Sequence, residues 1–188
     1  MRCFVAIDIG EEIKKALGDL QRQLASKADI KKGDVKWVRP EAIHLTLKFL
    51  GEIKDEQSVE VCNIVKEVAG RHESFELAVE SVGCFGGSSA RVLWVGTGTG
   101  SAHLQRLQKA LEQQLASAGW PEETRQFTSH LTLCRIRSHK AGVKLAQMIE
   151  DYKDFEFGVI SADSVLVYQS QLTPTGAVYT VLGNYKLQ

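Results

Sequence analysis

Apolar positions along the chain recur with two spacings, one typical of strands and one typical of helices. Continuous or alternating apolar runs predict strands over residues 3–9, 43–50, 75–82, 92–95, 130–136, 155–168 and 177–182. Apolar residues three and four apart predict amphipathic helices over residues 13–24, 59–68, 104–115 and 141–152. Helices and strands are therefore mixed along the whole chain.

Glycines mark the ends of several of these elements. Gly10 and Gly51 follow predicted strands, and Gly119 follows the third helical stripe, where it is a candidate C-cap. Glycines and serines are densest over residues 83–89, which predicts the most flexible connection in the chain. We place a structural midpoint near residues 86–90.

A tetrapeptide, His-Leu-Thr-Leu, occurs twice, at residues 44–47 and 130–133. An arginine, Arg39 or Arg125, precedes each histidine by five residues. Composition alone would repeat some tetrapeptide about one time in five in a chain of this length. The stronger sign is that the elements around the two copies recur at a similar offset, which predicts an internal duplication.

The predicted fold class is α+β, with two pseudo-symmetric lobes around a central cleft. Each lobe would be a mainly antiparallel β-sheet with helices on its outer face. We expect residues 1–188 to form a single bilobal domain. A pseudo-twofold axis would bring the two histidine strands to the cleft.

Composition and charge restrict the partners of the chain. Twenty-three basic residues balance twenty-three acidic ones, so no overall positive field exists to hold a long polyanion, and any nucleic-acid contact should be local. The four cysteines show no Cys-x-x-Cys spacing, and the N-terminal apolar run is too short for a signal peptide. We expect a cytoplasmic monomer with no membrane partner.

The repeated tetrapeptide carries candidate chemistry. Alternation along a strand places His44 with Thr46 on one face and His130 with Thr132 on one face. An imidazole titrates near neutrality and can be acid or base, and a threonine hydroxyl can donate to a phosphoryl oxygen. Two such pairs suit in-line attack at phosphorus without a metal or other cofactor.

These motifs resemble the paired His-x-Thr/Ser-x motifs of the two-histidine phosphoesterases, and within them the RNA 2′,3′-cyclic phosphodiesterases, historically called 2′-5′ RNA ligases. The similarity also covers segments outside the motifs, namely residues 2–7, Trp37-Val38, residues 48–51, Phe127, Arg135, residues 170–172 and residues 176–179. Ser129 stands where the family commonly has proline.

The resemblance implies that RNA ending in a 2′,3′-cyclic phosphate is hydrolysed to a 2′-phosphate. It also implies that His44 is the proton donor, that His130 is the proton acceptor, and that Arg135 contacts the phosphate beside Thr46 and Thr132. From the residues alone the two histidine roles are interchangeable. Regular alternation places Arg135 on the leucine face, so its role requires a strand irregularity.

Several alternatives stay open at this point. The chain could hydrolyse small cyclic-phosphate nucleotides or ADP-ribose cyclic phosphates, or bind nucleotides or RNA without reacting. It could also join RNA ends through a 2′,5′ linkage by the reversal of transesterification. Structural roles are the default for three further residues. Lys48 is expected to be an exposed strand lysine, Phe49 to be a core residue by parity with Leu45, and Phe85 to be a packing residue that could also stack on a base.

Overall fold

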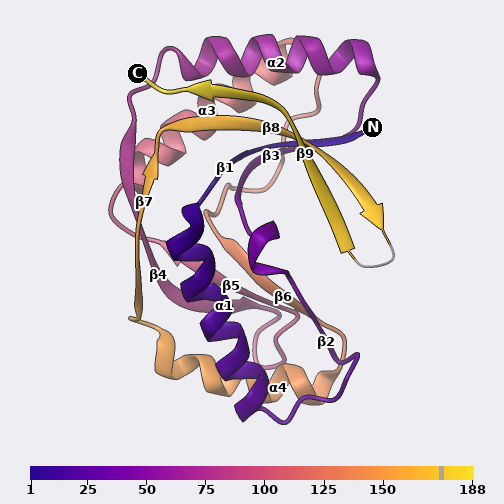
Figure 1. The fold of residues 1–188 in the computed structure, drawn as a ribbon, viewed down its shortest axis with the longest axis vertical. Helices are drawn as coiled ribbons and strands as arrows, with labels where there is room; N and C mark the ends of the chain where they lie inside the picture. Colours follow the sequence, from indigo (N-terminus) through magenta and orange to yellow (C-terminus); the bar gives the residue numbers. More distant parts are fainter. Residues whose placement is uncertain (174–175) are drawn as a thin grey trace.

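The computed structural model describes residues 1–173 and 176–188, which form two antiparallel β-sheets and four α-helices (Figure 1). This arrangement confirms the predicted α+β class. Across the described residues no helix is both long and apolar enough to cross a membrane.

Sheet A has four strands in the order β3-β1-β8-β9. Their bounds are β3 (Leu45–Glu52), β1 (Arg2–Ile7), β8 (Ser164–Thr173) and β9 (Gly176–Lys186). Two helices cover one face of this sheet, α2 (Asp55–Ala69) and α3 (Ser101–Ser117). Figure 1 shows α2 lying along the sheet at the top of the view.

Sheet B has five strands in the order β2-β6-β5-β4-β7. Their bounds are β2 (Val35–Trp37), β6 (Leu131–Ile136), β5 (Val92–Thr97), β4 (Phe75–Phe85) and β7 (Glu156–Ala162). The helices beside this sheet are α1 (Gly10–Lys27) and α4 (His139–Met148). Two short 3₁₀ helices complete the fold, η1 (Pro40–Ala42) and η2 (Ile149–Tyr152).

The two sheets exchange strands between the halves of the chain. β4, from the first half, pairs with β5 and β7 in sheet B. β8, from the second half, pairs with β1 in sheet A and brings β9 with it. Each sheet is therefore complete only when both halves are present.

The apolar stripes of the predicted helices form the core. The leucines of α3 are fully buried, which confirms that this stripe is core rather than an interaction surface: Leu104, Leu107, Leu111 and Leu115. Gly119 follows α3 with φ +98°, a backbone conformation that glycine adopts without strain, and its N–H donates to the Ala116 carbonyl. The C-cap residue itself is Ala118, and Gly119 is the left-handed residue directly after it, one position beyond the predicted C-cap.

One strand prediction was wrong, and one strand was not predicted. Residues 155–168 do not form one strand, because the pairing breaks at Asp163: β7 belongs to sheet B, and β8 belongs to sheet A. A continuous apolar run does not reveal which sheet a strand joins. The three-residue strand β2 was not predicted at all, since it is too short to establish an alternation.

Candidate active site

His44 lies in an aromatic pocket on sheet A. It follows η1 and immediately precedes β3. Its imidazole stacks on Phe4 with ring centroids 4.5 Å apart and meets the edge of Tyr179 at 5.1 Å, with Tyr168 at 6.1 Å. Burial among these rings lowers the pKa of His44 from 6.5 to about 4, although a hydrogen bond to the Ala42 backbone opposes the shift. The unliganded protein therefore favours neutral His44 near pH 7.

His130 has fewer aromatic neighbours. It immediately precedes β6 of sheet B, and the ring of Phe85 approaches it edge-on with centroids 5.4 Å apart. Phe85 also lies 5.5 Å from Trp94 and is 42% exposed. Phe85 is thus partly solvent-accessible beside His130.

Each imidazole is hydrogen-bonded to the backbone of the residue two positions upstream. The Nδ1 atom of His130 lies 2.7 Å from the Thr128 carbonyl oxygen, and the ring of His44 is hydrogen-bonded to the Ala42 backbone. An Nδ1–H that donates to a carbonyl leaves Nε2 of that ring available for proton transfer. The two motifs therefore repeat a local geometry as well as four letters.

Thr46 and Thr132 lie on the same faces as their histidines, partly buried in the strands. Thr46 is opposite Ala6 of β1, and Thr132 is opposite Trp94 of β5. We call the face of sheet A that carries Thr46 and Phe4, and the face of sheet B that carries Thr132 and Trp94, the motif faces. The helices cover the opposite faces, where Leu45 and Leu131 are fully buried.

A β-bulge follows the threonine in each motif strand. In β3 the partner of Ala6 is Thr46 and the partner of Val5 is Lys48, so Leu47 is the extra residue. In β6 the partner of Trp94 is Thr132 and the partner of Leu93 is Cys134, so Leu133 is the extra residue. A bulge reverses the alternation of the residues after it.

The bulges decide where the next two residues point. Lys48 and Cys134 turn to the buried side, with 8% and 0% of their surface exposed. Phe49 and Arg135 turn to the motif face, and Phe49 is 71% exposed. The expectations that Phe49 packs in the core and that Lys48 is exposed were therefore wrong, whereas the irregularity that Arg135 needs is present.

Arg135 lies in a row of residues across the motif face of sheet B. Its backbone pairs with Val92 of β5 on one side and with Lys36 of β2 on the other. Lys36 and Arg135 are both exposed, and like charges directly opposite each other in a sheet repel. An anion bound between them would relieve this repulsion.

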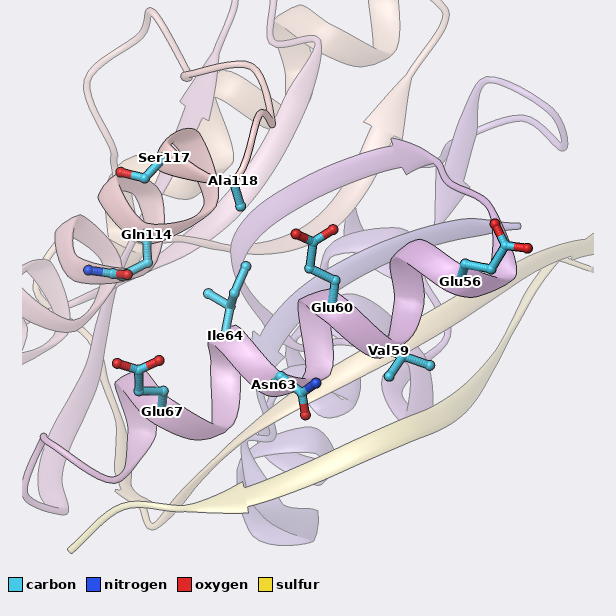
Figure 2. A pocket seen from close by; sticks show the side chains of 9 residues that line it. All are labelled: Glu56, Val59, Glu60, Asn63, Ile64, Glu67, Gln114, Ser117 and Ala118. Carbon is cyan, nitrogen blue, oxygen red and sulfur yellow. The ribbon is translucent and has the colours of Figure 1, made fainter.

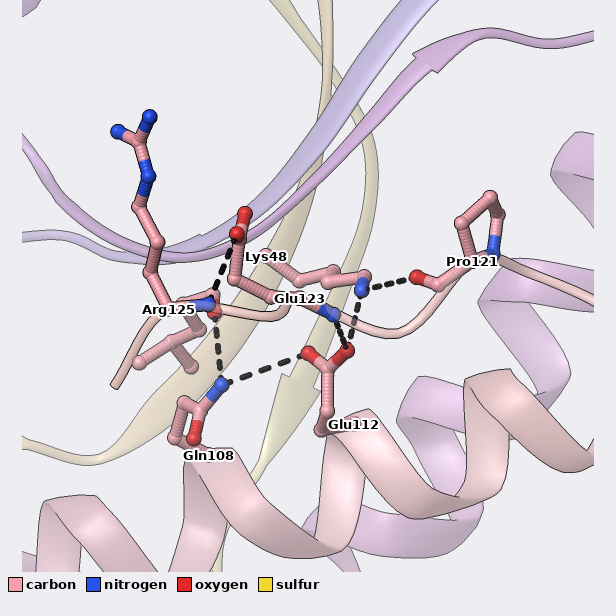
Figure 3. A network of polar contacts seen from close by, with 7 residues as sticks. Lys48, Gln108, Glu112, Pro121, Glu123 and Arg125 are labelled. Carbon is pink, nitrogen blue, oxygen red and sulfur yellow. Dashed lines mark hydrogen bonds and ion pairs between the residues drawn. The ribbon is translucent and has the colours of Figure 1, made fainter. Parts of the chain in front are cut away.

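Lys48 is held in a buried polar network, shown in Figure 3. Its ammonium group forms an ion pair with Glu112 of α3 and donates to the Pro121 carbonyl at 2.7 Å. Glu112 also accepts from the Glu123 backbone N–H at 2.7 Å. The network fixes β3 to the segment that leads from α3 to His130.

The connection between β2 and His44 joins the two sheets. Val38 donates its N–H to the Leu133 carbonyl at 2.9 Å, and the buried Gln21 side chain donates to both carbonyls, at 2.7 Å to Val38 and 2.9 Å to Leu133. Six residues after Val38 the chain reaches His44. Arg39 lies on this connection and donates to the Ala177 carbonyl of β9 at 2.8 Å, which gives it a structural partner.

Ser129, just before His130, is part of a chain of hydroxyl groups. Its Oγ lies 2.6 Å from Oγ1 of Thr97, which lies 2.9 Å from Oγ of Ser101. Ser101 in turn donates to the Gly98 carbonyl at 2.6 Å. This anchoring to β5 and α3 restrains the segment before the histidine by side-chain contacts.

The hollow drawn in Figure 2 does not contain either motif. It has a volume of about 500 Å³ and lies between α2 and the end of α3, on the helical side of the fold. Three carboxylates line it, Glu56, Glu60 and Glu67. This charge disfavours a phosphate ligand there.

Metal-ligating side chains do not gather around the motifs. Over residues 1–173 and 176–188 there is no group of three or more histidine, cysteine and acidic side chains placed to hold a metal ion. The Cys134 thiol is fully buried, and burial raises its pKa to about 12. It is therefore a packing residue at neutral pH rather than a thiolate ligand.

Sequence comparison identifies one family. The model of the family described as "LigT like Phosphoesterase" matches residues 7–94 and matches again over residues 95–179. A Methanocaldococcus jannaschii protein named RNA 2′,3′-cyclic phosphodiesterase is 33% identical over 183 residues, which are 97% of this chain and 98% of that protein. A Thermotoga maritima protein of the same name is 35% identical over 97% of this chain and 93% of its own length.

Solved structures share the fold over the whole chain. A protein of Thermus thermophilus superposes with a TM-score of 0.80 and 25% identity, covering 100% of this chain and 98% of that one. The E. coli LigT structure in complex with 3′-AMP superposes with a TM-score of 0.76 and 24% identity, covering 99% and 97%. At this level of identity the likeness to LigT extends to the fold alone.

Proposed function

The chain belongs to the LigT-like phosphoesterases, and on that basis we propose that it hydrolyses the terminal 2′,3′-cyclic phosphate of RNA to a 2′-phosphate, with His44 and His130 as an acid and base pair. Two relatives at least 33% identical are named for RNA 2′,3′-cyclic phosphate chemistry. Both histidines come from one chain, so a monomer would suffice.

The observation that carries this proposal is the matched geometry of the two motifs. Each supplies an imidazole hydrogen-bonded to the backbone two residues upstream, a threonine on the same face, and a bulge directly after that threonine. Acid and base catalysis of one displacement needs two proton-transfer groups. One histidine from each motif can therefore provide the acid and the base.

In the proposed reaction His130 removes a proton from water as the water oxygen attacks phosphorus. The new P–O bond forms while the P–O3′ bond breaks, and His44 donates its proton to the departing 3′ oxygen. The products are a 2′-phosphomonoester and a free 3′-hydroxyl. His130 gains one proton and His44 loses one, so the net number of protons on the enzyme is unchanged. Proton exchange with solvent then returns each histidine to its starting protonation state, and no metal is needed.

The pKa of His44 places a condition on the acid role. An imidazole with a pKa of about 4 holds little proton at neutral pH. A phosphate anion beside it favours the charged form and raises its pKa. We therefore propose that substrate binding protonates His44, so that the acid forms in the complex.

Three side chains are proposed to hold the phosphoryl oxygens. Thr46 and Thr132 would donate from the two motif faces, and Arg135 would neutralise the charge that develops in the transition state. The bulge at Leu133 supports the last assignment, because it turns Arg135 to the face of Thr132.

The test is an RNA oligonucleotide with a 2′,3′-cyclic end, incubated with the protein in excess chelator and analysed by ³¹P NMR. We expect a 2′-phosphate. A 3′-phosphate would contradict the proposed bond cleavage, and an unchanged end at pH 6 to 8 would favour a binding module. Adding an RNA with a free 5′-hydroxyl to the same mixture tests 2′-5′ ligation, in which that hydroxyl replaces water as the nucleophile, the P–O5′ bond forms and the P–O3′ bond breaks. A 2′-5′ linked product is the positive result.

A further inference from the structure

We infer that Lys36 binds the phosphodiester on the 5′ side of the nucleotide that carries the cyclic phosphate. The inference rests on the proposed function and extends it, because this contact would make the protein prefer RNA ends to nucleoside 2′,3′-cyclic phosphates, which have no second phosphate. Lys36 would determine specificity without taking part in proton transfer, since it lies on the strand beside Arg135 and outside both motifs.

Lys36 is held on the motif face of sheet B by strand pairing. β2 pairs with the end of β6 without a register shift, so Lys36 lies directly opposite Arg135. Its neighbours in β2, Val35 and Trp37, alternate to the other side and pack against the core. Residues directly opposite each other in a sheet share a face, so the Lys36 side chain projects beside that of Arg135.

The protein does not neutralise the charges of Lys36 and Arg135. In the described part of the chain neither side chain forms an ion pair. Other cations near the motifs have partners, since Lys48 forms a buried ion pair and Arg39 donates to a backbone carbonyl of β9. Exposed like charges directly opposite each other destabilise a sheet. Binding surfaces commonly carry such a cost, because the ligand supplies the missing counter-charge.

Two adjacent cations suit two neighbouring phosphates. Arg135 is proposed to contact the reacting phosphate, because the bulge at Leu133 turns it to the face of Thr132. Lys36 lies on the neighbouring strand, with its Cα about 5 Å from that of Arg135. Along an RNA chain the phosphate nearest to a 2′,3′-cyclic end is the 5′ phosphodiester of the same nucleotide. That phosphodiester is therefore the anion that Lys36 would reach.

Sheet A provides no equivalent pair of cations. There Phe49 holds the place that Arg135 holds in sheet B, two residues after the bulge, and the residue opposite it is Phe4. The RNA backbone should therefore leave the motifs over sheet B and pass β2. One local contact of this kind agrees with the balanced charge of the whole chain, which has 23 basic and 23 acidic residues.

The experiment compares two dinucleotide substrates that differ only in the charge of the internal linkage. Both are adenylyl-adenosine with a terminal 2′,3′-cyclic phosphate, one with the natural phosphodiester and one with a neutral methylphosphonate between the nucleosides. The variants are Lys36→Gln, which removes the charge, and Lys36→Arg, which keeps it. Lys109→Gln is the matched control, because Lys109 is an exposed lysine of α3, on the helical side of sheet A.

We expect Lys36→Gln to raise KM for the phosphodiester substrate about fivefold, with kcat little changed, because one charge-assisted contact is lost. KM for the methylphosphonate substrate should be the same in Lys36→Gln and the wild type. Lys36→Arg and Lys109→Gln should resemble the wild type on both substrates. An equal rise in KM on both substrates, or no rise on either, would overturn the inference.

Two further measurements distinguish a phosphate contact from a structural role. The binding constant of the phosphodiester ligand should fall with salt, and Lys36→Gln should reduce the slope of the log–log plot by about 0.7. At low salt Lys36→Gln should also unfold at a higher urea concentration than the wild type, because the repulsion with Arg135 is removed. An unchanged salt slope or a lower urea midpoint would contradict the inference.

Calorimetry keeps this test separate from the proposed hydrolysis. Its ligands are the product forms of the two dinucleotides, which end in a 2′-phosphate. If the wild type binds the phosphodiester form more tightly, loses this preference in Lys36→Gln and hydrolyses neither substrate, the inference stands and the proposed reaction fails. If the wild type hydrolyses both dinucleotides with the same KM, the proposed reaction stands and the inference fails.

Discussion

Leu47 and Leu133 occupy the same position in their strands, and at each of them the pairing with the neighbouring strand slips by one residue. The slip turns Lys48 and Cys134 inward and Phe49 and Arg135 outward. One backbone irregularity, present twice, thereby decides which side chains can reach a ligand. Residues on both sides of each bulge can be tested by substitution.

Replacing either motif histidine should remove one proton transfer. We expect His44→Ala and His130→Ala each to lower kcat on a cyclic-phosphate RNA end by at least about a hundredfold. His139→Ala is the matched control, since His139 is an exposed residue at the start of α4. Near-wild-type turnover in either motif variant would exclude that histidine from the mechanism.

Arg135 should act through its charge and its position on the motif face. We expect Arg135→Ala to lower kcat/KM about 10- to 100-fold, because a charge-assisted contact to the phosphoryl group is lost. Arg137→Ala changes an exposed arginine just beyond the end of β6 and should have little effect. Equal losses in the two variants would indicate only a general electrostatic effect, which should then weaken with added salt.

The low pKa of His44 should make stability depend on pH. The folded pKa, about 4, lies below the ordinary value of 6.5, so the unfolded chain binds the proton first as pH falls. Stability should therefore decrease from about pH 6.5 towards pH 4, with a loss of up to about 2 kcal/mol by pH 5 from this group. Urea unfolding at pH 7.5 and 5 measures it.

The control for this prediction is His44→Gln, whose side chain does not titrate. Its free energy of unfolding, measured in urea at pH 7.5 and 5, should depend less on pH than that of the wild type. In addition, ¹H–¹⁵N NMR titration of the wild type should show that inorganic phosphate moves the His44 midpoint upward. A midpoint near 6.5 without phosphate would show that the aromatic pocket does not desolvate this ring.

Removing one partner of the ion pair between Lys48 and Glu112 should lower the stability of the fold. Their side chains are 7% and 16% exposed, so Glu112→Gln leaves a nearly buried ammonium group without its counter-charge. We expect a loss of about 2 to 4 kcal/mol in the free energy of unfolding, measured in urea. The exposed pair of Lys153 with Glu150, at 62% and 58%, is the control, and Glu150→Gln should leave the free energy of unfolding nearly unchanged because solvent screens the pair.

The sequence predicted those features of the site that depend on a single strand, and it did not predict those that depend on pairing between strands. The period of two placed His44 with Thr46 on one face, because nothing interrupts the alternation between them. The same alternation predicted the wrong faces for Lys48 and Phe49, because a bulge at Leu47 reverses it. The bulge arises from pairing with β1, and no residue type in the motif predicts it. The same limit left Arg135 on the wrong face until the pairing of β6 with β5 was known.

The aromatic pocket around His44 could not be predicted from the sequence either. Phe4 lies in β1, whereas Tyr168 and Tyr179 lie in β8 and β9 near the other end of the chain, and only the order of sheet A brings them together. The internal duplication predicted from the recurring offset of the two motifs remains a prediction, and the two matches of the family sequence model are consistent with it. Strand exchange means that such a duplication would not correspond to two separable lobes.

The exchange of strands also has a consequence for synthesis. Sheet A cannot close until residues 164–186 have left the ribosome, although β1 and β3 are among the first elements made. Pairing between strands that are distant in the sequence slows folding, and the strands made first have unpaired edges until their partners are synthesised. A nascent chain would therefore carry its first histidine for most of translation without Tyr168 and Tyr179 beside it. The pocket that sets the acidity of His44 should be one of the last features of the molecule to mature.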